Sequence, residues 1–153
     1  MRTSRLGMAA AVAALMAATA SGAVAQERFT LRFNHVLGPS EPYHQGFQTW
    51  SQRVRERTNG GLTMQVFHSA QLGVEEDIIE QIRQGANIGQ NTDSARLGNY
   101  VKGIAVMNGP YFAETIEEVA KVADSPTVKG WVAELASQHG LQVVCFDWVQ
   151  GQR

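Results

Sequence analysis

The sequence predicts an α/β fold in which a mainly parallel β-sheet carries helices on both faces. Three observations predict this class. Along the chain, segments with alternating apolar and polar residues are followed by segments whose apolar residues recur every three or four positions. Glycines follow the helical segments at Gly60, Gly85 and Gly140, where a helix can end in the left-handed conformation. Strands that alternate with helices are typical of βαβ units and therefore of parallel sheets.

Three strands are predicted in the first part of the domain. Phe29, Leu31 and Phe33 point to one side of the first strand, and residues 62–66 repeat the same alternation. A third strand is expected within residues 86–91, where a glycine and several amide side chains weaken the pattern.

Two helices are predicted between these strands. The first is indicated by an apolar stripe that we expect to lie in the core, formed by Tyr43, Phe47, Trp50 and Val54. It should end at Asn59-Gly60-Gly61. The second helix is expected at residues 75–84, where the acidic residues 75–77 occupy the first turn and complement the helix dipole. These consecutive acids point in different directions, so we interpret them as helix-start charge rather than as paired catalytic carboxylates.

The rest of the chain is predicted to be helical before it returns to a strand. After a loop that contains Asn108-Gly109-Pro110, helices are expected at residues 113–123 and 126–139, and a strong strand at residues 141–148. Cys145, the single cysteine, lies in this apolar run and is expected to be a buried, inert thiol.

In an open parallel sheet, ligands bind beyond the carboxyl ends of the strands. The candidate segments are therefore residues 34–43, 67–73 and 91–96, each of which follows a predicted strand. His35 and His68 follow two of these strands and could reach a common cleft.

The sequence contains none of the common catalytic signatures, such as a nucleophile elbow, a P-loop or the zinc motif H-E-x-x-H. The four histidines lie on separate elements without the spacing of metal ligands. We therefore expect no enzyme activity, no catalytic residue, no metal and no cofactor.

The N-terminus is predicted to be a signal peptide. Arg2 and Arg5 precede an uncharged apolar run at residues 8–20, and Ala23-Val24-Ala25 supplies the small residues that a signal peptidase recognises. A transmembrane anchor needs roughly 20 apolar residues, more than this run offers. We expect residues 1–25 to be removed and the remainder to reach the periplasm without membrane insertion.

Cleavage would remove two arginines and no acidic residue, so the formal charge of −1 would become −3. No basic cluster is left that could hold nucleic acid or a membrane surface.

Three stretches resemble the solute-binding proteins of TRAP (tripartite ATP-independent periplasmic) transporters, the DctP-like family. The first is the opening strand with the helix that ends at Thr58-Asn59-Gly60-Gly61. The second, and most specific, is Ser69-Ala70-Gln71-Leu72-Gly73 followed by the helix from Glu76 to Gly85. The third is Gly151-Gln152-Arg153, which is similar to the family's step between its two lobes. The chain departs from the family at residues 86–89, where an aspartate is common.

The resemblance implies a domain organisation and a function. Residues 26–148 would form the first lobe of a two-lobe clamp, residues 149–153 would begin the crossover, and the second lobe would be missing. The clamp would capture a small carboxylate, such as a C4-dicarboxylate, and deliver it to TRAP permease subunits in the membrane. By resemblance, the ligand-binding candidates are Arg153, Asn34, Asp93 and Arg96.

Other functions stay open at this level. The chain could belong to a solute-binding protein of an ABC-type importer, or to a periplasmic sensor or small exported enzyme. A neighbouring gene for a multi-spanning permease would favour the TRAP function, and one for an ATPase would favour the ABC function.

Overall fold

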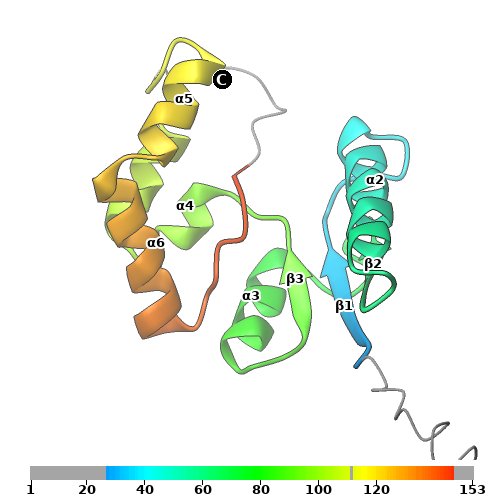
Figure 1. The fold of residues 1–153 in the computed structure, drawn as a ribbon. Coiled ribbons are helices and arrows are strands. Elements are labelled where there is room, and N and C mark those ends of the chain that lie inside the picture. Colours follow the sequence, from blue (N-terminus) through cyan, green and yellow to red (C-terminus); the bar gives the residue numbers. More distant parts are fainter. Residues whose placement is uncertain (1–26, 111, 147–153) are drawn as a thin grey trace, which may run out of the picture.

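The computed structural model describes residues 27–110 and 112–146, which form a three-stranded parallel sheet with helices (Figure 1). In chain order the elements are β1 (Phe29–Asn34), α2 (Pro42–Arg57), β2 (Leu62–Phe67), α3 (Glu75–Arg83), β3 (Ile88–Gln90), α4 (Ser94–Leu97), the 3₁₀ helix η1 (Lys102–Asn108), α5 (Ile116–Ala123) and α6 (Pro126–His139). The predicted α/β class is confirmed. The predicted signal peptide and the 149–153 crossover, with Arg153, lie outside the described residues.

The strand order β2-β1-β3 explains why helices cover both faces. β1 pairs with β2 from Phe29↔Leu62 to Asn34↔Phe67, and with β3 from Arg32↔Ile88 onward. The chain moves one way from β1 to β2 and the opposite way from β2 to β3. Right-handed crossovers in opposite directions place their helices on opposite faces, and Figure 1 shows α2 and α3 on the two sides of the sheet.

The first core lies between α2 and the sheet. Its buried members are Phe33, Phe47 and Met64, and the ring of Phe33 meets those of Phe47 and Trp50 edge-on at centroid distances of 4.8 and 5.4 Å. Tyr43 packs against the same cluster. The predicted core role of the helical stripe is therefore confirmed for Tyr43, Phe47 and Trp50, whereas Val54 lies outside this cluster.

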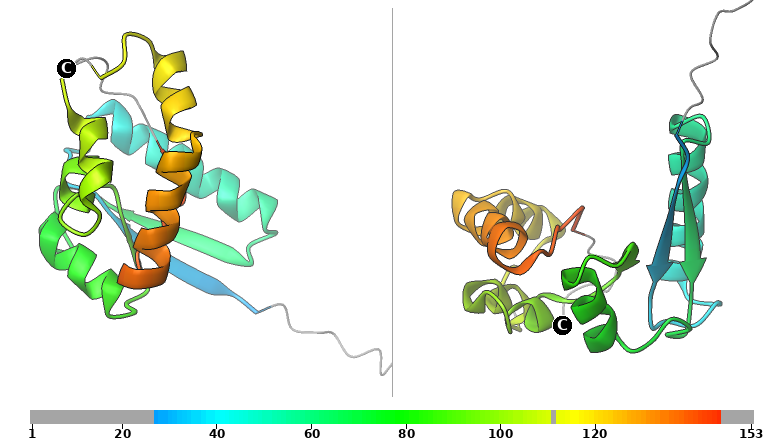
Figure 2. Two further views of the ribbon diagram at one scale, coloured as in Figure 1. Left: turned by 90° about the vertical axis from the view of Figure 1, so that its left-hand side faces the viewer. Right: turned by 90° about the horizontal axis from the view of Figure 1, so that it is seen from below.

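The second core joins α3 to the helices that follow the sheet. Its buried residues come from α3, η1, α6 and the segments beside them: Ile79, Val101, Ile104, Met107, Val128, Leu135 and Leu141. The right-hand view of Figure 2 shows α5 and α6 grouped at the opposite side of the molecule from α2. No helix in residues 27–110 or 112–146 has the length and apolar character needed to cross a bilayer.

Two short helices stand where the sequence predicted a loop. α4 begins because the Asp93 side chain accepts a hydrogen bond from the backbone N–H of Arg96. η1 buries Ile104 and Met107, which together with the buried Val101 before it recur every third residue, the repeat of a 3₁₀ helix. α5 starts at Ile116 rather than at residue 113, after the capping box formed by Thr115 and Glu118.

The strand predicted at residues 141–148 is wrong for its described part. Residues 141–146 are not part of the sheet. A strand exists only where a neighbouring strand exchanges backbone hydrogen bonds with it, and none of the described strands does so here. Leu141, Val143 and Phe146 instead pack against the second core, and Leu141 N–H donates to the carbonyl of Leu135.

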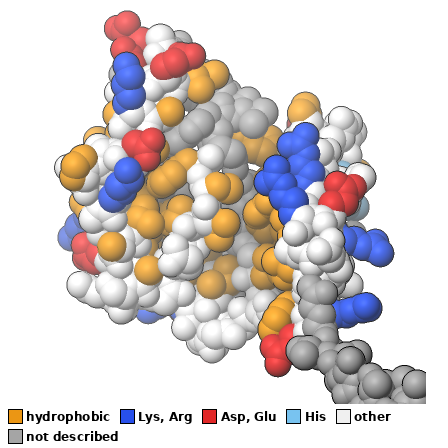
Figure 3. All heavy atoms as spheres, viewed as in Figure 1, with side chains coloured by type: hydrophobic (Ala, Val, Ile, Leu, Met, Phe, Trp, Pro, Cys, Tyr) orange, Lys and Arg blue, Asp and Glu red, His pale blue; other side chains and the backbone are white. Residues whose placement is uncertain are grey.

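Side chains between these packing residues face outward. Val144 is 76% exposed, and Cys145 is exposed, so its predicted burial is wrong. Figure 3 shows hydrophobic side chains between the helical group and the sheet, with basic side chains gathered beside α2.

Candidate functional site

The loops after the three strands meet at one edge of the sheet, as the parallel topology predicts. The backbone N–H of Ser69 donates to the Leu37 carbonyl at 2.9 Å, and that of Ala70 to the His35 carbonyl at 3.0 Å. The N–H of Asn91 donates to the Asn34 carbonyl at 3.1 Å. The loops after β2 and β3 are thus both bonded to the end of β1, and they form a continuous rim.

Asn34 is completely buried beneath this rim. Its Nδ2 donates to the carbonyl of Gly73 at 3.1 Å and to Oε1 of Gln90 at 2.8 Å, while its Oδ1 accepts from the N–H of Leu72 at 3.2 Å. One amide therefore ties the loop after β2 to β3. The structure therefore places this candidate ligand residue under the rim, where its hydrogen bonds hold the rim loops in position.

Arg96 lies at the centre of a network of charges on the rim. Its Nε is 3.0 Å from Glu75 Oε2 and 2.9 Å from Glu76 Oε1, and its Nη1 is 2.7 Å from Asp93 Oδ2. The structure therefore brings together the candidates Asp93 and Arg96. Asp93 also has the capping role that Asn and Asp often take in loops.

Glu75 is a member of this network that the sequence analysis interpreted only as helix-start charge. It is 7% exposed, and its Oε2 also accepts a hydrogen bond from Thr92 Oγ1 at 3.1 Å. Burial raises the pKa of Glu75, whereas the Thr92 hydrogen bond and the Arg96 charge lower it. An acid at the first helical position after a strand-end loop is the signal that could have indicated its place.

The network of Glu75, Glu76, Asp93 and Arg96 has three acceptor groups around one guanidinium, which gives a formal charge of −2. Carboxylate oxygens that face solvent accept hydrogen bonds from hydroxyl groups, and the planar guanidinium fixes their spacing. Arg96, Glu76 and Asp93 are partly exposed, so a solute can reach them. No group of three side chains suited to hold a metal ion occurs in residues 27–110 or 112–146.

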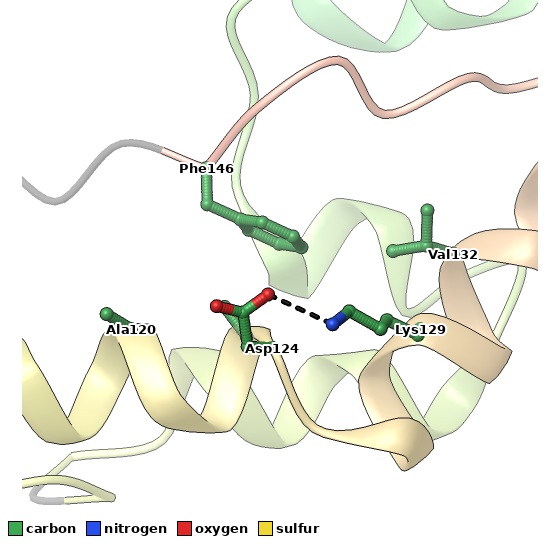
Figure 4. A pocket seen from close by; sticks show the side chains of 6 residues that line it. Ala120, Asp124, Lys129, Val132 and Phe146 are labelled. Atoms are coloured by element: carbon green, nitrogen blue, oxygen red, sulfur yellow. Dashed lines mark ion pairs between the residues drawn. The ribbon is translucent and has the colours of Figure 1, made fainter.

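A hollow lies away from the strand ends, between α5, α6 and the 141–146 segment (Figure 4). Ala120, Val132 and the ring of Phe146 line it, and the ion pair of Asp124 and Lys129 at 3.1 Å closes one side. Both charged groups of this pair are largely exposed. The hollow has few polar groups that converge on one point, so the rim is the better candidate.

A family model described as bacterial extracellular solute-binding protein, family 7 (DctP), matches residues 33–153. Among curated proteins, a solute-binding protein of Chromohalobacter salexigens is 26% identical over 72% of this chain and 32% of its own length. The C4-dicarboxylate-binding periplasmic protein DctP of Rhodobacter capsulatus is 26% identical over 95% of this chain and 43% of its own length. The chain spans about a third of the length of the first of these relatives and less than half of the second.

Solved structures show the same similarity. A TRAP periplasmic solute-binding protein from Escherichia fergusonii in an open, ligand-free state matches with a TM-score of 0.73 and 28% identity, over 78% of this chain and 40% of that one. One from Ochrobactrum anthropi with bound L-fuconate matches with a TM-score of 0.70 and 27% identity, over 72% of this chain and 37% of that one. In both, the matched part is well under half of the solved chain.

Proposed function

This chain belongs to the bacterial extracellular solute-binding proteins of family 7, and from that membership we propose that it forms one lobe of a periplasmic protein that captures a small organic acid for a TRAP transporter. The observation that carries the proposal is the family match over residues 33–153, which includes the end of β1, the strands β2 and β3 and every rim loop. The TRAP relatives favour this transporter class over the ABC-type importer that the sequence left open. A solute carrier needs no catalytic group.

A second lobe would form the other wall of the binding site. The two walls would close around the solute by a hinge motion. The loaded clamp would then dock on the permease subunits in the membrane. In this arrangement Arg153 would hold the carboxylate of the solute, because a guanidinium binds a carboxylate with two parallel hydrogen bonds. Asn34 would support the site without touching the solute, because its hydrogen bonds fix the loop after β2 and Gln90 of β3.

The charges of the rim favour a hydroxyl-rich acid over a plain C4-dicarboxylate. The Arg96 network carries more negative than positive charge, so it repels a second carboxylate and accepts hydrogen bonds from hydroxyl groups. We therefore propose a sugar acid whose hydroxyl chain faces Glu75, Glu76 and Asp93. The L-fuconate bound to the Ochrobactrum protein is an acid of this kind.

We expect the purified chain to bind L-galactonate with a Kd of about 1 mM, because one wall should give roughly half of a micromolar interaction of about −8 kcal/mol. Succinate and uncharged galactitol should bind more weakly, because succinate lacks the hydroxyl groups and galactitol lacks the carboxylate. The measurement is a ¹H–¹⁵N NMR titration that follows the signals of residues 91–96. Micromolar binding by this chain alone would contradict the two-walled clamp.

Arg96→Gln should weaken L-galactonate binding by at least about tenfold, because three carboxylates would then meet the anionic solute without a compensating charge. The matched control is Arg83→Gln, which also removes an arginine from an acidic partner, Glu80, on α3. Arg83→Gln should bind as the wild type does. Equal affinities for the two variants would remove the Arg96 network from the site.

Export is tested separately from binding. Expressed in a bacterium with its own leader, the protein should be recovered from the periplasmic fraction with Gln26 as its first residue, because Ala23-Val24-Ala25 fits a signal peptidase site. Intact mass spectrometry gives the result directly. A mass that still includes residues 1–25 would contradict export by cleavage.

A further inference from the structure

Three histidines from three different segments gather beside the ends of β1 and β2. His35 follows β1, His44 lies in the first turn of α2, and His68 follows β2. Nε2 of His35 is 3.0 Å from Nδ1 of His44, and the ring centroids of His44 and His68 are 5.2 Å apart. The cluster thus connects the start of α2 to both strand ends.

His35 is the fixed member of the cluster. It is 0% exposed, and its ring packs against Phe47 with centroids 5.1 Å apart. Its backbone N–H donates to the Phe67 carbonyl, and its own carbonyl accepts from Ala70. Its Nδ1 is buried, and no hydrogen-bond partner for that atom lies in the described part of the chain.

This environment selects the proton positions at neutral pH. The bond between His35 and His44 needs one ring nitrogen with a hydrogen and one without. If His35 carries its hydrogen on Nε2, it donates to His44, and its Nδ1 is left as a bare lone pair. The opposite arrangement would bury an N–H at Nδ1 without an acceptor, which costs more free energy than a bare lone pair. Nε2 of His44 then carries a hydrogen, and the exposed Gln48 amide, whose nitrogen lies 3.4 Å from it, can turn to present its oxygen.

A proton on His44 reverses this bond. A protonated His44 has a hydrogen on both nitrogens, so its Nδ1 can only donate, and Nε2 of His35 must accept. The hydrogen of His35 then has to move to Nδ1, where no acceptor stands.

The surrounding charges do not relieve this cost. Burial lowers the pKa of His35 most, and His44 from α2 and His68 from the loop after β2 lower it further. Residues 68–74 and the three residues of β3 contain no acidic side chain. Glu41, the residue before α2, is exposed and is not among the groups that shift the pKa of His35.

We propose that His35, His44 and His68 form a proton-sensitive latch that holds the start of α2 against the ends of β1 and β2 at neutral pH and weakens in acid. In the unfolded chain His35 takes up a proton near pH 6.5, while in the folded protein its lowered pKa delays this to lower pH. Stability is therefore complete above about pH 6.5 and falls as the pH drops below that value. The latch does not depend on the identity of the solute.

The test is thermal unfolding of the purified protein, followed by circular dichroism at pH 7.5, 6.5 and 5.5. The wild type should lose roughly 4 °C in Tm between pH 6.5 and 5.5 from this cluster. His35→Phe, which keeps a ring of similar size beside Phe47, should lose markedly less over the same range. The control His139→Gln, at the end of α6, should retain the wild-type loss. Equal losses in wild type and His35→Phe would overturn the proposal.

A second measurement does not require a variant that folds. Long-range ¹H–¹⁵N NMR spectra of the wild type should show the His35 hydrogen on Nε2 at pH 7.5 and no titration of its ring near pH 6.5. Hydrogen exchange of the amides in the first turn of α2, corrected for intrinsic rates, should accelerate in acid more than that of α6. An His35 ring that titrates normally in the folded protein, or an α2 start with unchanged protection, would contradict the latch.

Discussion

Asn34→Leu is expected to lower the free energy of unfolding by about 3–5 kcal/mol. The substitution removes three hydrogen bonds at once and leaves the N–H of Leu72, the carbonyl of Gly73 and the amide oxygen of Gln90 without their partner. Each buried polar group that loses its partner costs about 1–3 kcal/mol. Urea denaturation followed by circular dichroism measures the change.

The matched control is Asn87→Leu. Asn87 donates a single hydrogen bond to the carbonyl of Thr30 from an exposed position, where water can replace it. The control should lose less than about 1 kcal/mol. If Asn34→Leu were as stable as the control but failed to bind L-galactonate, Asn34 would be a direct ligand contact rather than a support of the rim.

Leu135→Ala is expected to lower the free energy of unfolding by about 3–5 kcal/mol. Leu135 is 0% exposed and lies in the second core, with Ile79 of α3 and Ile104 of η1. Truncation removes buried apolar surface and leaves a cavity that the neighbouring helices fill only in part. The change is measured by the same urea denaturation.

Val144→Ala serves as the control for this prediction. Val144 lies in the segment that follows α6 and is 76% exposed, so its truncation should change the stability by less than about 0.5 kcal/mol. A loss below 1 kcal/mol for Leu135→Ala would mean that α6 is not packed on α3 and η1 in solution.

Local patterns in the sequence were sufficient for most of the fold. The alternation in residues 29–33 and the stripe of Phe47 and Trp50 report which face of an element is apolar. α2 and β1 bury that face except at its outer end, where Phe29 is 59% exposed. Gly140 takes a φ of 69°, the left-handed conformation predicted for a residue that ends a helix. These features depend on neighbours within one or two turns.

Features that depend on distant partners could not be predicted in this way. Residues 141–146 have the alternation of a strand, but strand formation requires a partner that the pattern does not specify. The pairing of Arg96 with Glu75 and Glu76 joins residues that approach only after the loop following β3 has folded back over α3. The spacing of Val101, Ile104 and Met107 was visible, but a repeat of three falls between the helical and the strand periods.

The position of β1 in the middle of the sheet has a consequence for how the chain folds. All members of the first core lie within residues 29–67, so the β1–α2–β2 unit can close with contacts that are near in sequence. As the chain emerges from its N-terminus, this unit can assemble before the residues of the second core arrive. The Asn34 amide, already fixed at the end of β1, then offers its hydrogen bonds to Leu72, Gly73 and Gln90 as they emerge. A buried polar side chain thus serves as the docking point between an early folding unit and a late one.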